Sequence, residues 1–363
     1  MHEALELARR GWGRVAPNPL VGAVVARGDE VVGRGWHAQF GEDHAEVIAL
    51  REAGPRAADS TLYVTLEPCT HRGKKPPCVD AIRSAGVRRV VIACHDPNPN
   101  AGGGADALRA AGMDVEVGSG GTAARRLNAA FLWRQVTGTP FTSLKLALSL
   151  DSKLGAVGVR SAVSGPTALE YVHRLRAAHE AIMIGRRTAE IDDPRLTARG
   201  EIQPRRPPIR IVLDPTLRVG ADSRLAGTID EGPVWLIADV ASAENPERRG
   251  PLEDAGVEVL GFPRGADGRL DTEEIWSALV GRGVDSILVE GGGHTAAGLL
   301  NQCRIQRMHL IVAPLFFGES GVPAFPGVDG EEDAWRPVAL EALGHDSHVL
   351  LEHRSLDTAL ERI

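Results

Sequence analysis

The amino-acid sequence predicts an α/β protein built from two domains in succession. Short apolar runs of strand length alternate with amphipathic stretches of helix length along the chain, which is the pattern of α/β folds. The 363 residues exceed the usual size of a single hydrophobic core. The run Thr137-Gly138-Thr139-Pro140 interrupts the alternation, because glycine and proline both resist continuing a helix. We therefore expect one domain over residues 1–139 and a second over residues 140–363.

The first half alternates between strand and helix signals. Two apolar runs, residues 21–26 and 31–36, flank Arg27-Gly28-Asp29, a turn-forming cluster that is typical of hairpins. Further strands are expected at residues 61–65 and 88–93, and helices at residues 77–85, 106–111 and 123–136. This order predicts an α/β sandwich.

The second half repeats the alternation and contains a glycine-rich turn. Strands are expected at residues 141–147, 181–184, 209–213, 234–237 and 286–289, with a helix at 296–302. In the run from Glu290 to Thr295, glycines would let backbone amides approach a phosphate at a helix N-terminus. The spacing fits the dinucleotide fingerprint only loosely, and no acidic residue follows about 20 positions later, so a Rossmann fold is disfavoured. The structural alternative is a turn that serves only tight packing.

The composition favours a small-molecule substrate over nucleic acid or membrane. The formal net charge of −7 opposes binding to phosphate backbones, and aromatic residues make up only 4% of the chain. The N-terminus is acidic and amphipathic, so no signal peptide is expected, and no apolar run approaches transmembrane length. Two of the four cysteines belong to an expected metal motif, so a disulfide framework is not expected and the cytosol is the expected compartment.

His44, Cys69 and Cys78 have the pattern of a catalytic zinc site. A structural zinc is usually closed by four protein ligands, whereas a catalytic zinc leaves one position for water. Glu46 is then a carboxylate that can move the proton of that water. A His/Cys/Cys zinc with a non-ligating Glu is typical of nucleobase deaminases. The alternative for each residue alone is a place in the hydrophobic core, where cysteines are often found.

The two cysteines are separated by a longer loop than the usual Pro-Cys-x-x-Cys pattern allows. This loop would bring His71 and Lys74 beside the metal, where they could bind an anionic or strongly hydrogen-bonding substrate. A phosphorylated small molecule therefore fits better than a flipped base.

Several motifs together resemble a known family. The segments Pro17 to Gly22, His44 to Val47, Leu66 to His71 and Pro76 to Cys78 resemble those of the bifunctional deaminase-reductases of riboflavin biosynthesis, the RibD family, and the match covers nearly the whole chain. The resemblance implies that the N-terminal half deaminates a diaminopyrimidinone carrying a ribosylamino phosphate, and that the C-terminal half reduces the ribose with NADPH. It also implies a cytidine-deaminase-like α/β/α sandwich, a dihydrofolate-reductase-like α/β domain and a homo-oligomer.

The resemblance also assigns roles residue by residue. It implies that His44, Cys69 and Cys78 hold Zn2+, that Glu46 is the proton shuttle, and that the deaminase pocket is lined by Asn18, His37, His71 and Lys74. In the reductase it implies substrate contacts from Lys145, Ser161, Arg176, Asp192, Leu196, Arg199 and Glu290. It implies NADPH contacts from Ala147, Thr188, Asp192, Gly292, Gly293, His294, Thr295 and Gly298. The proton donor for reduction stays open among Lys145, Asp192 and Glu290.

Four positions of the second half depart from the family pattern. Ser152 stands where Gly is usual, the segment after Ser161 lacks a Trp common in the family, and Arg187 and Pro215 replace smaller residues. One alternative function is therefore an active deaminase with an impaired or repurposed reductase. A nucleic-acid deaminase would need a basic, aromatic-rich surface, and a binding module without turnover would have no use for Glu46.

Overall fold

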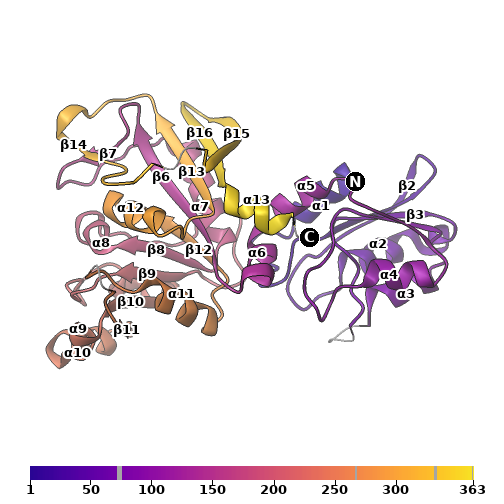
Figure 1. Ribbon diagram of the computed structural model, residues 1–363, viewed down its shortest axis with the longest axis horizontal. Helices are drawn as coiled ribbons and strands as arrows, with labels where there is room; N and C mark the ends of the chain where they lie inside the picture. Colours follow the sequence, from indigo (N-terminus) through magenta and orange to yellow (C-terminus); the bar gives the residue numbers. More distant parts are fainter. Residues whose placement is uncertain (72–75, 266–267, 331–332, 362) are drawn as a thin grey trace. The chain divides into compact units, whose positions relative to one another are not determined.

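The computed structural model describes residues 1–71, 76–265, 268–330, 333–361 and 363. It divides into two compact units, one comprising Met1–Gly138 with Thr358–Ile363 and the other comprising Thr139–Asp357 (Figure 1). Each unit contains a β-sheet of its own. Within the described ranges, no helix combines the length and the apolar character needed to cross a lipid bilayer.

The first unit is built on a five-stranded mixed sheet in the order β2-β1-β3-β4-β5. Strand β1 pairs antiparallel with β2 and with β3, whereas β3, β4 and β5 run parallel. The strands are β1 (Gly22–Arg27), β2 (Glu30–Trp36), β3 (Thr61–Val64), β4 (Arg89–Ile92) and β5 (Asp114–Val117). The expected hairpin and both later strands are confirmed, while β5 was not expected.

Helices cover both faces of this sheet (Figure 1). The larger core joins one face to residues of α2, α3 and α4, and a smaller cluster joins Ala4 and Leu7 of α1 to Val24 on the other face. The helices are α1 (His2–Arg9), α2 (Ala45–Ala53), η1 (Gly54–Ala57), α3 (Cys78–Ser84), α4 (Gly104–Ala110), α5 (Gly121–Leu127) and α6 (Ala129–Thr137). The predicted α/β/α sandwich is confirmed.

The prediction of a single helix over residues 123–136 is wrong. Two helices, α5 and α6, meet at Asn128, which has φ −102° and ψ 20°. The Asn128 side chain accepts a hydrogen bond from the Leu20 amide at 2.7 Å and donates one to the Leu20 carbonyl at 2.9 Å. These bonds to a distant segment hold Asn128 outside helical geometry, and local helix propensity gives no sign of them.

Close approach between α2 and β2 positions the expected zinc motif. A Cβ atom on Gly35 would lie 2.1 Å from the Ala45 carbonyl oxygen, and one on Gly33 would lie 2.2 Å from that of Ala49. Any side chain at these positions would force the helix away from the sheet. His44 is the N-cap of α2 and Glu46 lies in its first turn, so both residues are held against the sheet.

The second unit contains a nine-stranded sheet in the order β11-β10-β9-β8-β12-β6-β13-β16-β15. The strands from β11 to β13 run parallel, and β16 and β15 add antiparallel pairs at one edge. The strands are β6 (Phe141–Ser149), β8 (Ala181–Gly185), β9 (Ile209–Leu213), β10 (Val234–Asp239), β11 (Glu258–Phe262), β12 (Ser286–Glu290), β13 (Arg307–Ala313), β15 (Trp335–Leu343) and β16 (Asp346–His353). Strands β7 (Lys153–Ala156) and β14 (Gly321–Pro323) form a separate pair. All five strands expected in this half are present.

Two large apolar clusters pack on the faces of this sheet. One joins β6, β8 and β12 to α11 and α12, and the other joins β8, β9 and β10 to α8 and α10. The helices are α7 (Pro166–Ala178), α8 (Arg186–Asp192), η2 (Ala226–Glu231), α9 (Val240–Ala243), α10 (Pro246–Asp254), α11 (Thr272–Gly281), α12 (Gly293–Asn301), η3 (Gly318–Ser320) and the start of α13 (Arg354–Leu360), whose residues from Thr358 on belong to the first unit. Because parallel strands end at the same edge, this arrangement gathers the ends of β6, β8 and β12 in one place.

Two candidate active sites

Three side chains from separate segments of the first unit meet as a metal-binding group. The ligand atoms of His44, Cys69 and Cys78 all lie within 4.8 Å of one another. His44 Nδ1 lies 3.1 Å from Cys78 Sγ and 3.6 Å from Cys69 Sγ. Ligand separations of about 3.5–3.8 Å follow from tetrahedral zinc with Zn–N and Zn–S bonds of about 2.0–2.3 Å. The donor set therefore fits zinc, the separations from His44 lie within a few tenths of an ångström of this range, and three protein ligands leave a fourth position for chemistry.

The hydrogen bond between the two thiols moves their pKa values in opposite directions, whereas burial raises both. Hydrogen bonds from the Cys78 side chain and from His44 lower the pKa of Cys69 to about 4. The hydrogen bond to Cys69, together with burial, raises the pKa of Cys78. One thiolate is thus already favoured before metal binding, and the second proton would leave as the metal binds.

A cavity of about 220 Å³ opens beside this group. Its lining includes His44, Cys69 and the carboxyl-bearing Glu46, which is 3% exposed. Burial raises the pKa of Glu46, which favours a carboxyl able to hold a proton as well as release it. A metal-binding group and a buried carboxyl therefore face the same cavity.

The expected pocket residues Asn18, His37 and His71 also line this cavity. Asn18 Nδ2 donates to His37 Nε2 at 3.1 Å, and His37 Nδ1 donates to the Asp43 carbonyl at 3.2 Å. Burial lowers the pKa of His37, so these two bonds hold a neutral imidazole in one orientation. His71 is exposed, and Lys74 lies outside the described residues.

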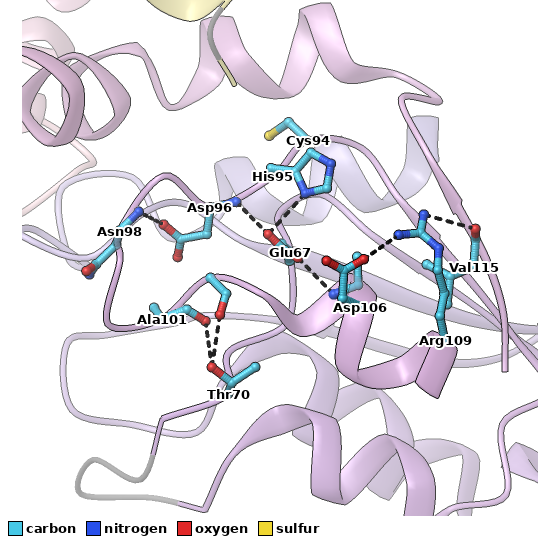
Figure 2. Close-up of polar contacts among 12 residues, drawn as sticks. Glu67, Thr70, Cys94, His95, Asp96, Asn98, Ala101, Asp106, Arg109 and Val115 are labelled. Atoms are coloured by element: carbon cyan, nitrogen blue, oxygen red, sulfur yellow. Dashed lines mark hydrogen bonds and ion pairs between the residues drawn. The ribbon is translucent and has the colours of Figure 1, made fainter. Parts of the chain in front are cut away.

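Sequence reasoning missed three polar residues of this cavity, Glu67, Asp96 and Asn98. Asp96 and Asn98 follow β4, and burial raises the pKa of Asp96 to about 6. Glu67 is buried and accepts hydrogen bonds from the segment that carries Asp96 (Figure 2). Their positions in the sequence could have indicated this role, because all three residues follow parallel strands and binding residues gather at the ends of such strands in open α/β sheets.

The second unit contains a cavity of about 990 Å³ at the ends of its parallel strands. Thirteen of the fourteen residues implied for reductase substrate and cofactor binding line it, and the exception is Arg199. The lining members are Lys145, Ala147, Ser161, Arg176, Thr188, Asp192, Leu196, Glu290 and, from the glycine-rich turn and helix α12, Gly292, Gly293, His294 and Thr295, with Gly298 beside them.

Arg199 lies on the exposed surface outside the cavity lining. Its backbone amide donates to His173 Nδ1 at 3.1 Å, and His173 belongs to helix α7 together with Arg176. Desolvation and the charge of Arg176 lower the pKa of Arg199. The charges of Arg199 and the cavity residue Arg176 therefore affect each other, although Arg199 is not part of the cavity wall.

A buried group of three charges lies in the cavity wall. Arg176 donates to both carboxylate oxygens of Glu290, at 2.5 and 2.9 Å, and to the Thr197 carbonyl at 3.1 Å. Lys145 on β6 is paired in register with Glu290 on β12. Burial lowers the pKa of Lys145, an effect that Glu290 opposes. Burial opposes ionisation of Glu290, yet the charge and hydrogen bonds of Arg176 hold its pKa below the usual value.

Comparison with family models identifies both halves of the chain. Residues 1–94 match the cytidine and deoxycytidylate deaminase zinc-binding region, and residues 140–349 match the RibD C-terminal domain. A riboflavin biosynthesis protein RibD from Escherichia coli is 39% identical over 349 residues, which is 92% of each chain. The corresponding protein from Bacillus amyloliquefaciens is 37% identical and covers 91% of this chain and 88% of the relative.

Solved structures are similar over the same extent. A RibD structure from Acinetobacter baumannii matches with a TM-score of 0.83 and 33% identity, covering 97% of both chains. A Thermotoga maritima diaminohydroxyphosphoribosylaminopyrimidine deaminase/5-amino-6-(5-phosphoribosylamino)uracil reductase matches with a TM-score of 0.83 and 30% identity, again over 97% of both chains.

We predict that Asp96→Asn stabilises the first unit in a pH-dependent way. Because the folded-state pKa of about 6 exceeds the ordinary value of 3.8, the folded protein binds this proton more tightly, and stability falls as pH rises towards 6 and above. The neutral amide removes this cost, so the variant should gain about 1–3 kcal/mol at pH 8. Differential scanning calorimetry of the zinc-loaded protein should show a gain that shrinks between pH 7 and pH 5. A gain independent of pH would contradict the prediction.

We predict that Glu290→Gln strongly destabilises the second unit. The change leaves Arg176 and Lys145 buried beside a neutral amide, and breaking a buried ion pair costs roughly 3–5 kcal/mol. Glu253→Gln is the matched control, since Glu253 pairs with Arg249 at 2.8 Å with both side chains more than 40% exposed, and it should cost less than about 1 kcal/mol. Urea unfolding measures both changes. Equal costs would show that the buried pair does not stabilise this unit.

Proposed function

Because the chain belongs to the RibD family of riboflavin biosynthesis, we propose how its residues divide the two reactions of this bifunctional deaminase and reductase. We assign zinc-dependent deamination to residues 1–139 and NADPH-dependent reduction to residues 140–363. The proposed substrate is 2,5-diamino-6-(5-phosphoribosylamino)pyrimidin-4-one, and the product is 5-amino-6-(5-phosphoribitylamino)uracil. The observation that carries the proposal is the meeting of His44, Cys69 and Cys78 beside the buried carboxyl of Glu46.

In the deaminase site, His44, Cys69 and Cys78 would hold the zinc. When bound, zinc supplies Lewis acidity, which makes a water molecule an effective nucleophile near pH 7. Glu46 would take one proton of this water and give it to the ring nitrogen, and would then carry the second proton of the same water to the departing amine, so that one C–N bond breaks, one C–O bond forms and ammonia leaves. Asn18, which is oriented by its bond to the pocket residue His37, hydrogen-bonds the pyrimidine, and His71 and Lys74 bind the phosphorylated part of the substrate.

In the reductase site, NADPH supplies the hydride and the protein positions both reactants. Thr188, Ala147 and the segment Gly292 to Gly298 hold the cofactor. Ser161, Leu196 and Arg176 hold the substrate, and Arg199 adds positive charge outside the cavity wall. The opening of the sugar ring at C1′ needs one proton in addition to the hydride, and it leaves the ribityl chain reduced by two electrons.

We assign that proton to Lys145. Glu290 is bound at both oxygens by Arg176, which keeps it ionised and therefore unable to donate. Asp192 is only half-buried, although burial raises its pKa. Lys145 lies in the cavity wall beside Glu290, and burial lowers its pKa, so it gives up a proton more readily than an exposed lysine.

We further propose a small-molecule enzyme that acts in the cytosol as a homo-oligomer, with no nucleic-acid or membrane partner. Reduced thiols are needed for the zinc site, and the cytosol keeps thiols reduced. A net charge of −7 opposes binding to nucleic acid. Light scattering coupled to gel filtration would measure the oligomeric state.

The function is tested by incubating zinc-loaded protein with the proposed substrate, with and without NADPH, while ammonia and NADPH absorbance are followed. Ammonia should form in both cases, and NADPH should be consumed only as the deaminated product appears. Glu46→Gln should slow ammonia release by at least about 100-fold through loss of the proton carrier. The variant should keep its zinc and still oxidise NADPH when given the deaminated pyrimidine. Unchanged ammonia release would refute the role of Glu46, and ammonia without NADPH oxidation would mean that the reductase is impaired.

Lys145→Met tests the proton donor. Methionine keeps the unbranched apolar part of the lysine side chain, lacks its ammonium group and leaves the Arg176–Glu290 pair intact, so the fold and NADPH affinity should be preserved. Single-turnover hydride transfer should fall by about 100-fold or more, as expected for loss of a general acid. Asp192→Asn provides the comparison. If Lys145→Met retains its single-turnover rate and Asp192→Asn loses it, the proton comes from Asp192.

A further inference from the structure

Glu67 is a buried carboxylate that the proposed chemistry does not use. It follows strand β3 and precedes the ligand Cys69 by two residues, and it is 6% exposed. Its Oε1 accepts a hydrogen bond from the Ala105 amide at 2.8 Å. Its Oε2 accepts from the Asp96 amide at 3.1 Å and lies 3.2 Å from His95 Nδ1 (Figure 2). One side chain thus binds both ends of the segment 95–105.

Other contacts join the same two stretches of chain. The Thr70 amide donates to the Ala101 carbonyl at 3.1 Å. Thr70 Oγ1 donates to the Gly102 carbonyl at 2.9 Å and lies 3.4 Å from the Ala101 carbonyl oxygen (Figure 2). A Cβ atom on Gly104 would lie 1.9 Å from the Pro68 carbonyl oxygen, so the two backbones touch there. The stretch 67–70 and the segment 95–105 therefore form one packed body around the metal ligand Cys69.

The segment held by Glu67 forms part of the wall of the smaller cavity. Asp96, Asn98 and Ala101 line that cavity together with Glu46 and Cys69. Bonds within the segment give it a defined shape, because the Asn98 amide donates to Asp96 Oδ1 at 2.9 Å and the Ala101 amide donates to the Asn98 carbonyl at 2.9 Å. A wall that is ordered before the substrate arrives spares the complex the entropy of ordering it on binding.

The carboxylate of Glu67 is suited to holding both ends of the segment 95–105. Two acceptor oxygens receive two backbone amides and face one imidazole nitrogen. An amide side chain has one acceptor oxygen, and its NH2 group would face an N–H donor in place of the second oxygen. A Gln at this position would therefore release one end of the segment and leave a buried donor unsatisfied.

We propose that Glu67 is a positioning residue of the deaminase, which sets substrate affinity by clamping the segment 95–105 to the stretch that carries Cys69. The inference rests on the proposed deaminase function. Glu67 acts through Asp96 and Asn98, and it touches neither the reacting atoms nor the proton that Glu46 carries.

The test is Glu67→Gln in the full-length, zinc-loaded protein. Steady-state deamination should show KM raised about tenfold, the change expected for one lost charge-assisted hydrogen bond, with kcat within about threefold of the unchanged protein. Zinc content should stay the same. Hydrogen exchange followed by mass spectrometry should show faster exchange in peptides that contain Asp96 and Ala105. Thr70→Val removes a second bond of the clamp and should raise KM in the same direction by a smaller factor, which keeps the proposal testable if Glu67→Gln folds poorly.

Asp106→Asn is the matched control, because it lies on the same helix α4 as Ala105. Its carboxylate accepts from Arg109 at 2.9 Å and is 87% exposed, so neither KM nor exchange should change (Figure 2). Unchanged KM in Glu67→Gln, or a fall in kcat accompanied by zinc loss, would overturn the positioning role. If the unchanged protein releases no ammonia, the proposed function fails instead, and protected exchange at Asp96 and Ala105 in Glu67→Gln would then overturn the clamp independently.

Discussion

The close contact between helix α2 and strand β2 is the constraint on which the first active site depends. Gly33 and Gly35 let the helix backbone lie directly on the strand, and the N-terminus of that helix carries His44 and Glu46. Cys69 follows β3, and Cys78 begins α3. Since the three ligands come from segments that meet only in the finished sandwich, metal affinity and folding of this unit must be coupled. The metal-binding group therefore requires the folded sandwich as well as the three ligand residues.

The second active site depends on buried charge instead. Arg176 and Lys145 face one carboxylate, Glu290, so the buried group carries an excess of positive charge when Lys145 is protonated. Arg160, Arg186 and Arg187 also line the cavity. A chain with a net charge of −7 thus concentrates positive charge where a phosphorylated substrate and NADPH would lie. Low-dielectric walls strengthen such a field, which favours anionic ligands at this cavity over the rest of the surface.

The sequence predicts those parts of the fold and of the metal site that depend on residues close together in the chain. The apolar runs give the strands β1, β3 and β12, and His44, Cys69 and Cys78 were identified from residue type and spacing. The break at Asn128 could not be predicted, because its cause is a pair of hydrogen bonds to Leu20, 108 positions away in the chain. Asp96 lies in a run of Pro and Asn that reads as an ordinary turn, and only the fold shows that this turn faces the metal-binding group. Residues that act through distant partners leave no periodic pattern for sequence analysis to detect.

Two departures from the family pattern, Ser152 and Arg187, lie in a turn and at the rim of the larger cavity. Neither belongs to the buried group of Lys145, Arg176 and Glu290. Ser152 has a positive φ of 58°, in the turn between β6 and β7, which explains why glycine suits this position. A non-glycine residue there costs about 1–2 kcal/mol locally, and Ser152 does not belong to the cavity lining. Arg187 is exposed at the rim and adds positive charge towards an anionic cofactor. Because Lys145, Arg176 and Glu290 keep their mutual contacts, these substitutions alter local backbone stability and the charge of the rim while the arrangement that would perform reduction stays intact.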